Sequence, residues 1–376
     1  MSYLNNFSNL VVFEDIIFEV FFHGICSMKN LIISSIVCFL FLLSNLTFAT
    51  TDLPPVVLPD DEGAHHYNLE WWYYTGHLET VGLETPRKFA FEMTVFREEV
   101  FAPLTGYVAH FAFIDLDEKK HHPFQRINIF ASLLPPAPTQ QGFKFVFDDG
   151  KWLVEGKGGH DKLQAKTAEY SIDLKLDAIK PPALFGNQGI VDYGTAGKMA
   201  YYSRTRMNTV GSVTIPNKNG HQSTYRVTGM TWMDHQWGNS GNPIQMGWDW
   251  FSVQLKNEID LMIFHVRNKN TKEILKTAGF IISKSGEVSS IPEELIEIKA
   301  VNPLSLETIS YPTQWNIKVP APYHIDFNIK ARFAEQRFKV PAQVTPVYWE
   351  GSCTTEGWFQ GEPVEGQGFT EMAGYE

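Results

Sequence analysis

The most constraining feature of this sequence is a two-residue alternation of apolar and polar side chains that recurs along the chain. It is clear in Lys88–Arg97 and in residues 170–179, 259–267 and 324–333, and turn sequences such as "DDGKW", "NKNG" and "SKSGE" separate such runs. Alternation rich in β-branched and aromatic residues predicts strands, and no long stretch has a helical period. We therefore expect an all-β protein whose 376 residues form a pair of barrels or sandwiches.

Composition predicts a large packed core and disfavours a nucleic-acid-binding protein. The chain is 44% apolar and 14% aromatic, and its formal net charge is −11. A protein that follows a phosphate backbone needs a basic face, so we expect no nucleic-acid partner. The oligomeric state stays open.

The segment that begins at Met28 has the pattern of a secretory signal peptide. Lys29 precedes the apolar run Leu31–Leu43, and small residues permit cleavage after Ala49. The run is shorter than the roughly 20 residues that a membrane-spanning helix needs. We therefore expect cleavage and no stable membrane insertion afterwards, with an uncleaved anchor as the alternative.

Cysteine use agrees with export. Cys26 and Cys38 precede the expected cleavage site, so the mature chain would keep only Cys353 and could form no internal disulfide. Such an exported protein, periplasmic or secreted, would rely on its core rather than on disulfides. Whether Met1 or Met28 starts the chain stays open.

Two distant segments resemble each other and predict an internal repeat. Trp71–Leu78 and Trp248–Leu255 share aromatic residues at the first, third and fourth positions and Leu at the eighth. Each is followed by a turn and then by a segment ending in Arg, namely Glu92–Arg97 and Met262–Arg267. We expect two related β domains, each opening with an aromatic-rich hairpin.

Four motifs in order resemble the AttH/CrtC lipocalin-like family: "YNLEWWYYTGHLE", "TWMDHQWG", "GWDWFSVQL" and the terminal "YWEGSC…VEGQGFTEMAGYE". Members are often described as predicted secreted hydrolases, and the family is related to carotenoid 1,2-hydratases. The resemblance implies an all-β fold of two tandem lipocalin-like β-barrel domains. We expect an N-terminal extension and signal peptide in residues 1–49, a first domain in 50–228 and a second in 229–376.

The motif "DHQW" supplies the first candidate catalytic residues. The family resemblance implies that His235 binds water and that Trp237 stabilises a carbocation. In an extended strand these two side chains face one way and Asp234 faces the other. Asp249, between two tryptophans, is the first candidate for the proton donor, and Asp234 is the second. The alternative is that His235 and Asp234 form an inter-domain hydrogen-bond hub.

Glu70 is the remaining catalytic candidate. Alternation places it on the same strand face as Trp72 and Tyr74, where burial could raise its pKa and make it an acid. It could equally form a structural ion pair with an arginine such as Arg97 or Arg206.

Aromatic side chains are expected to line a cavity at the domain interface or at a barrel mouth, where pockets are common. The expected lining residues are Trp72, Tyr74, Trp232, Trp248 and Trp250. His65 and His66 could start a metal site with Glu70, but adjacent residues of a strand point to opposite faces. We therefore expect no metal and no cofactor.

Three functions remain open. The first is binding of an apolar, isoprenoid- or lipid-like small molecule without turnover. The second is a cofactor-free lyase of the hydratase type, which would add water to a carbon–carbon double bond. A secreted hydrolase ranks last, because no G-x-S-x-G nucleophile motif is present.

Overall fold

The regular structure of the chain is almost entirely β. The computed structural model describes residues 53–101, 104–132, 141–239, 246–306, 309–341 and 345–375. Its only helical elements within these ranges are single 3₁₀ turns: η1 (Asp60–Glu62), η2 (Asp148–Gly150), η3 (Gly194–Ala196) and η5 (Glu293–Leu295). The all-β prediction is thus confirmed, while the expected signal peptide lies outside the described residues. No helix in the described part is long and apolar enough to span a membrane.

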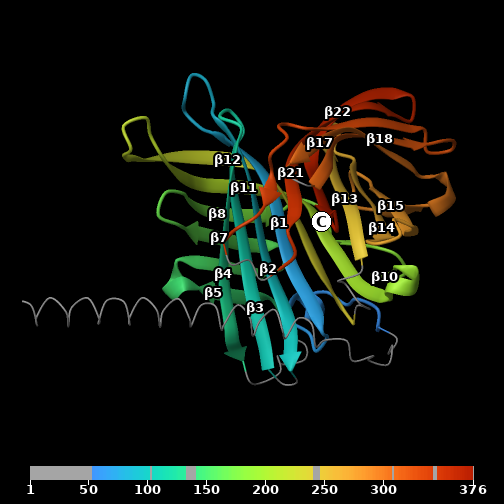
Figure 1. The fold of residues 1–376 in the computed structure, drawn as a ribbon, viewed down its shortest axis with the longest axis horizontal. Coiled ribbons are helices and arrows are strands. Elements are labelled where there is room, and N and C mark those ends of the chain that lie inside the picture. Colours follow the sequence, from blue (N-terminus) through green and yellow to red (C-terminus); the bar gives the residue numbers. More distant parts are fainter. Residues whose placement is uncertain are drawn as a thin grey trace, which may run out of the picture. The chain divides into compact units, whose positions relative to one another are not determined.

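The first sheet has twelve strands and runs from blue to olive in Figure 1. Its main path is β4-β3-β2-β1-β12-β11-β8-β7-β6-β5, with β9 and β10 paired to β11. The edge strands β4 and β5 also contact each other, so the sheet curls into a nearly closed barrel. The strands are β1 (Leu69–Thr80), β2 (Lys88–Phe101), β3 (Leu104–Asp115), β4 (Lys120–Ser132), β5 (Phe143–Phe147), β6 (Trp152–Lys157), β7 (His160–Lys166), β8 (Ser171–Ala178), β9 (Ala183–Leu184), β10 (Ile190–Asp192), β11 (Lys198–Pro216) and β12 (Gln222–Gly238).

The second sheet has ten strands, coloured yellow to red in Figure 1. Its path is β16-β15-β14-β13-β22-β21-β19-β18-β17, with β20 paired to β21. The strands are β13 (Met246–Leu255), β14 (Asp260–Asn268), β15 (Ile274–Ile282), β16 (Val288–Ile291), β17 (Glu297–Leu306), β18 (Ile309–Val319), β19 (Ile325–Ala331), β20 (Arg337–Phe338), β21 (Tyr348–Phe359) and β22 (Glu362–Ala373).

The two sheets share one connectivity, which is what the internal repeat predicts. In each, four consecutive strands form a meander, and the last long strand of the domain returns to pair with the first. The pairing registers agree too: Arg97 lies opposite Glu70, and Arg267 lies opposite Gly247. Glu70 and Gly247 each directly precede the first tryptophan of the aligned segments. The aromatic-rich hairpins are therefore equivalent in position.

The change of sheet falls after the expected domain boundary. Strand β12 pairs with β1 and β11 through Gly238, and the second sheet starts at Met246. The boundary expected at residue 229 thus lies inside β12. Gly229 is a close-approach position rather than a turn, because a Cβ there would lie 1.9 Å from the carbonyl oxygen of His77.

Strand alternation distributes the core over three layers. In β1, Trp72 and Tyr74 face the interior of the first barrel, whereas Tyr73 faces the second sheet. In β13, Phe251 faces the interior of the second sheet and Trp250 faces the first. We call the layer between the sheets, to which Tyr73 and Trp250 belong, the inter-sheet layer.

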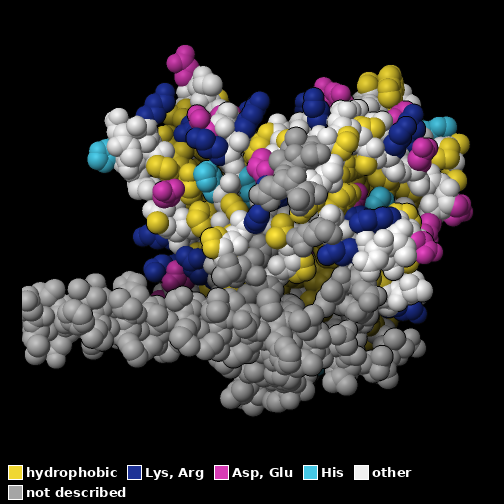
Figure 2. Space-filling view, viewed as in Figure 1, with side chains coloured by type: hydrophobic (Ala, Val, Ile, Leu, Met, Phe, Trp, Pro, Cys, Tyr) yellow, Lys and Arg dark blue, Asp and Glu magenta, His cyan; other side chains and the backbone are white. Residues whose placement is uncertain are grey.

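On the face shown in Figure 2, basic and acidic side chains are interspersed over both sheets.

Candidate functional site

The structure divides the expected catalytic residues among three places. His235 and Trp237 point into the first barrel, as strand alternation predicts. Asp234 points the other way, into the inter-sheet layer, together with Trp232. Asp249 lies inside the second domain, where its hydrogen-bond partners belong to the second half of the chain. These residues therefore do not converge on one substrate.

The expected lining residues divide in the same way. The first barrel holds Trp72 and Tyr74, and the inter-sheet layer holds Trp232, Trp248 and Trp250. Two separate candidate sites follow, one on each face of strands β1 and β12.

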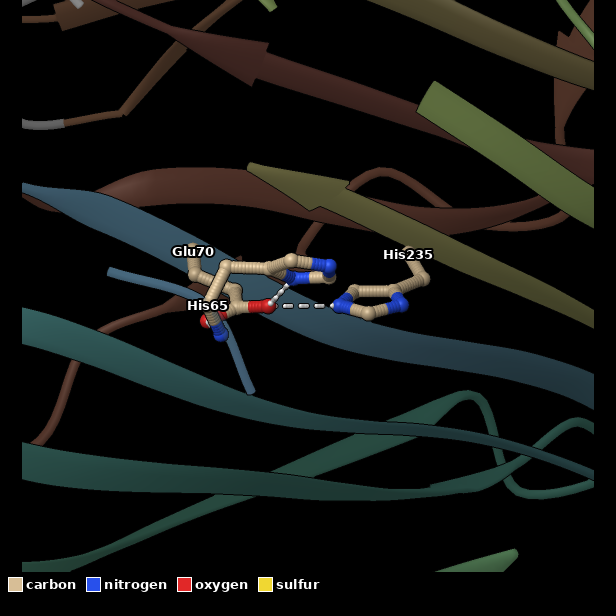
Figure 3. Close-up of side chains that lie close together, drawn as sticks. All are labelled: His65, Glu70 and His235. Atoms are coloured by element: carbon tan, nitrogen blue, oxygen red, sulfur yellow. Dashed lines mark hydrogen bonds and ion pairs between the residues drawn. The ribbon is translucent and has the colours of Figure 1, made fainter. Parts of the chain in front are cut away.

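The site inside the first barrel is built around Glu70, as Figure 3 shows. Oε1 of this carboxylate lies 2.7 Å from Nδ1 of His65 and 2.8 Å from Nε2 of His235. Its second oxygen, Oε2, accepts from the backbone N–H of His65 at 2.9 Å. Glu70 and His235 are fully buried, and His65 is partly buried. We call these three residues the barrel triad.

Indole rings hold both imidazoles of the barrel triad in place. The His65 ring stacks on Trp237 with 4.0 Å between centroids and 5° between planes. The His235 ring stacks on Trp72 with 4.4 Å between centroids. Because β1 and β12 pair with Trp72 opposite His235, sheet register alone brings these rings together.

Electrostatics give the three groups of the barrel triad different charges. Burial would raise the pKa of Glu70, but hydrogen bonds and charges from His235 and His65 lower it below the usual value. Burial opposes protonation of His65, yet Asp61 and Glu70 raise its pKa overall. Burial lowers the pKa of His235 to about 4 despite Glu70. Glu70 is thus a stable carboxylate, and the expectation that burial makes it an acid is wrong. Arg97, the expected ion-pair partner of Glu70, donates instead to the carbonyl oxygen of Tyr67 at 2.8 Å.

The barrel triad also has the donor set of a metal site. One atom from each residue lies within 4.8 Å of the others, and two His with one Glu is a known ligand set for catalytic zinc. The sequence predicted no metal, because the adjacent residues His65 and His66 point to opposite faces of a strand. The second imidazole of the triad comes instead from β12, 165 residues further along the chain than Glu70.

The second candidate site is a group of four carboxyl side chains in the inter-sheet layer, of which Glu92, Asp234 and Glu350 are buried and Glu371 is partly buried. Glu92 and Asp234 come from the first sheet, and Glu350 and Glu371 come from the second. Glu350 and Glu371 lie directly opposite each other on β21 and β22. Like charges in that position repel, so this arrangement favours protonated carboxyls. We call these four residues the inter-sheet acids.

Two of the inter-sheet acids have a free oxygen. Tyr73 donates to Oε1 of Glu350 at 2.9 Å, and Tyr348 donates to Oε1 of Glu92 at 3.1 Å. Oε2 of Glu350 and Oε2 of Glu92 have no hydrogen-bond partner among the described residues. Buried polar atoms without a partner are rare and costly, so they point to a place for a ligand or water.

Burial and mutual repulsion raise the pKa values of these groups. Burial, followed by the charges of Glu371 and Glu92, raises the pKa of Glu350 well above its usual value. Burial raises the pKa of Glu92 to about 8, against hydrogen bonds from Thr94 and Tyr348. Burial likewise raises the pKa of Glu371 to about 7. Protonated acids are therefore present in this layer at neutral pH.

Asp234 differs from Glu92 and Glu350 because both of its oxygens accept hydrogen bonds. It accepts from Ser203, from the Tyr201 hydroxyl and, at 2.6 Å, from the indole N–H of Trp232. Tyr201 in turn accepts from the Trp250 indole of the second sheet at 3.1 Å. The expected hub of His235 and Asp234 is therefore found only for Asp234, because His235 pairs with Glu70 and Tyr202 inside the first barrel.

Asp249 has the surroundings of a structural ion pair. Arg267 donates to its Oδ1 at 2.6 Å, and the Tyr375 hydroxyl lies 2.9 Å from its Oδ2. Burial would raise the pKa of Asp249, but His265, Arg267 and Tyr375 lower it. A carboxylate held ionised in this way is poorly suited to donate a proton.

Sequence reasoning missed Glu92, Glu350 and Glu371. Two of them lie within the quoted terminal motif, in "YWEG" and "FTEM", each next to aromatic or apolar residues. The pattern could have identified them, because alternation places Glu350 on the same strand face as Tyr348 and Glu371 on the same face as Phe369, and a carboxyl on such a face indicates a polar group in a core.

A pocket of about 520 Å³ lies over β5 to β8 of the first barrel. Its lining includes Phe143 and Asp161. Phe143 lies against Trp72, with 5.8 Å between centroids, and Asp161 accepts from the Tyr74 hydroxyl at 2.8 Å. The pocket therefore adjoins the aromatic interior of the barrel.

Comparison with known proteins gives one family and two related structures. The AttH-like family model matches residues 49–375. A Nitrosomonas europaea protein solved under the provisional name AttH is 25% identical, covers 87% of this chain and 99% of its own, and has a TM-score of 0.74. Kievitone hydratase from Nectria haematococca is 16% identical, with 88% and 96% coverage and a TM-score of 0.66. No curated protein matches the chain.

Proposed function

This chain belongs to the AttH-like family, and we propose that it binds an apolar, unsaturated compound between its two sheets and adds water to a carbon–carbon double bond of that compound. The observation that carries the proposal is the buried Glu350, whose Oε2 has no protein partner among the described residues. A hydratase among proteins of this fold is consistent with the proposal.

Glu350 is the proposed proton donor. Its carboxyl is fully buried, and the Tyr73 hydroxyl fixes its orientation by donating to Oε1. The proton therefore resides on Oε2, the free oxygen. A carboxylic acid kept neutral by an apolar site can protonate one carbon of a double bond, as general acids do.

Aromatic rings next to Glu350 suit the cation that protonation creates on the other carbon. Tyr73 and Trp250 meet edge to face at 5.4 Å, and Trp232 lies 6.1 Å from Trp250. The faces of such rings attract cations. Trp71 and Trp248 are half-buried at the edge of the same layer, so they suit an entrance for an apolar molecule.

Glu92 is the proposed water-orienting group. Tyr348, which donates to it, is two residues from Glu350 on β21, so both face the same layer. A water molecule beside Oε2 of Glu92 would form the new carbon–oxygen bond. The proton that this water loses replaces the one that Glu350 gave up, so the sum of the steps is addition of one water.

The test is turnover by Glu350→Gln. With acyclic isoprenoid polyenes in water labelled with heavy oxygen, the native protein should yield a product carrying one labelled hydroxyl. Glu350→Gln should lower the rate roughly 100- to 10,000-fold, the usual contribution of a general acid, with substrate affinity retained. Glu356→Gln, an exposed glutamate on the same strand, is the matched control.

The second candidate function is binding without turnover. The aromatic residues of the inter-sheet layer favour it equally, because they suit an apolar ligand whether or not it reacts. If the native protein binds polyenes but never yields a labelled product, its function is binding without turnover. Undiminished turnover by folded Glu350→Gln would remove Glu350 from the mechanism.

Export of the protein is a separate proposal that rests on the sequence alone. If Met28 starts translation and the signal is cut after Ala49, the mature chain begins at Thr50. N-terminal sequencing of protein from the host's periplasm or medium checks this. A mature chain that retains Leu31–Leu43 would contradict it.

A further inference from the structure

Beyond the proposed hydration, we propose that the barrel triad binds one divalent transition-metal ion, best suited to Zn²⁺. The three donor atoms are Nδ1 of His65, Oε1 of Glu70 and Nε2 of His235, and they converge as Figure 3 shows. Neutral imidazoles with one carboxylate are preferred zinc ligands, and three protein ligands leave a fourth position for water.

The spacing of the donor atoms needs only a small adjustment. Zinc binds nitrogen and oxygen at about 2.0–2.2 Å, which places neighbouring ligands of a tetrahedron about 3.3 Å apart. The corresponding separations from Oε1 of Glu70 are 2.7 Å to His65 and 2.8 Å to His235. A shift of about half an ångström in each side chain therefore makes room for the ion.

The atoms that do not face the ion already have partners that orient the ligands. Nε2 of His65 lies 3.3 Å from Oδ1 of Asp61, and Nδ1 of His235 lies 3.3 Å from the Tyr202 hydroxyl. The second oxygen of Glu70 accepts from the backbone N–H of His65. A carboxylate behind a histidine is the usual outer partner of a zinc ligand. Each imidazole is thereby turned so that its other nitrogen points to the common centre.

The elements that carry the ligands suit a metal site. Glu70 and His235 lie on the paired central strands β1 and β12, which fix them. His65 lies on the segment before β1, and its side chain is 16% exposed, next to Asp61 at 26%. That edge gives an ion a path from solvent. Trp72, on the barrel face of β1, separates this site from Tyr73 and the inter-sheet acids on the opposite face.

Metal-free mature protein titrated with ZnCl₂ in a calorimeter tests the proposal. We expect one Zn²⁺ per chain, and a tetrahedral-type visible spectrum when CoCl₂ replaces zinc. His65→Ala should abolish this binding, and Asp61→Asn should weaken it roughly 10- to 100-fold, as loss of an outer partner does. His66→Ala is the matched control, because this neighbouring imidazole is exposed, and it should bind like the native protein.

His65→Ala is chosen because its side chain is partly exposed and its loss leaves the strands intact; a thermal melt in EDTA verifies folding. Zinc should raise the melting temperature of the native protein and not that of His65→Ala. The proposal is overturned if the native chain binds no zinc, or if His65→Ala binds it with the same affinity, in which case the triad is a metal-free hydrogen-bond network. Neither outcome bears on Glu350, so the hydration proposal is tested independently.

Discussion

Glu92→Gln should flatten the pH dependence of stability at neutral pH. The folded pKa of Glu92 is about 8, and the usual value is 4.5. Between these values the folded protein keeps a proton that the unfolded chain has released. Stability from this group is therefore fully present below about pH 4.5 and is lost as the pH rises toward 8.

The size of the effect follows from the length of the pH window. Each pH unit within it costs about 1.4 kcal/mol, so a rise from pH 5 to pH 7.5 should lower the free energy of unfolding by about 3 kcal/mol for this one group. Its charged and titratable neighbours are Glu371, Glu350 and Tyr348, which belong to the opposite sheet. Glu371 and Glu350 should add slopes of the same sign.

Urea unfolding of the protein at several pH values between 5 and 7.5 measures this. Glu92→Gln keeps an acceptor for Thr94 and Tyr348 but cannot ionise, so the loss of stability over this range should shrink by about 3 kcal/mol. Absolute stability is a poorer measure, because the new amide N–H groups have to find partners. Glu356→Gln, at an exposed position, should keep the native slope. A native slope in Glu92→Gln would refute the claim that Glu92 is protonated in the folded state.

Two further predictions concern the scaffold. Arg267→Met should lower the free energy of unfolding by roughly 3–5 kcal/mol, because it leaves the Asp249 carboxylate buried without its cation. A urea titration measures the loss, and a change below about 1 kcal/mol would contradict a stabilising ion pair. Gly229→Ala should lower the melting temperature, because its Cβ would meet the His77 carbonyl oxygen of the paired strand, whereas unchanged melting would show that β1 and β12 approach less closely than described.

Strand alternation allowed much of the fold to be predicted. The two-residue period identifies strands such as Lys88–Arg97, and the repeat identifies the hairpins that begin at Trp71 and Trp248. The same period correctly separated His235 and Trp237 from Asp234. These successes rest on local geometry, which fixes the side of a strand on which each side chain lies.

Long-range pairing could not be predicted, and the sites depend on it. His235 meets Glu70 only because β12 returns to pair with β1, and Glu350 meets Tyr73 only because the two sheets pack together. The two-residue period shows that a residue lies on one of two strand faces. It does not show which core each face contacts. Asp249 shows the period at work: alternation places it on the face opposite Trp248 and Trp250, and it points into the other core.

That geometry explains how one pair of strands can carry two unrelated sites. Trp72 and Tyr73 are consecutive on β1, and one contacts the barrel triad while the other contacts Glu350. The barrel side combines a carboxylate with two imidazoles, a set that attracts a cation. The inter-sheet side combines neutral acids with aromatic rings, a set that accepts apolar molecules and can give up a proton. Because the backbone of β1 lies between the two, each site keeps its own electrostatics, and proton transfer on one face needs no group from the other.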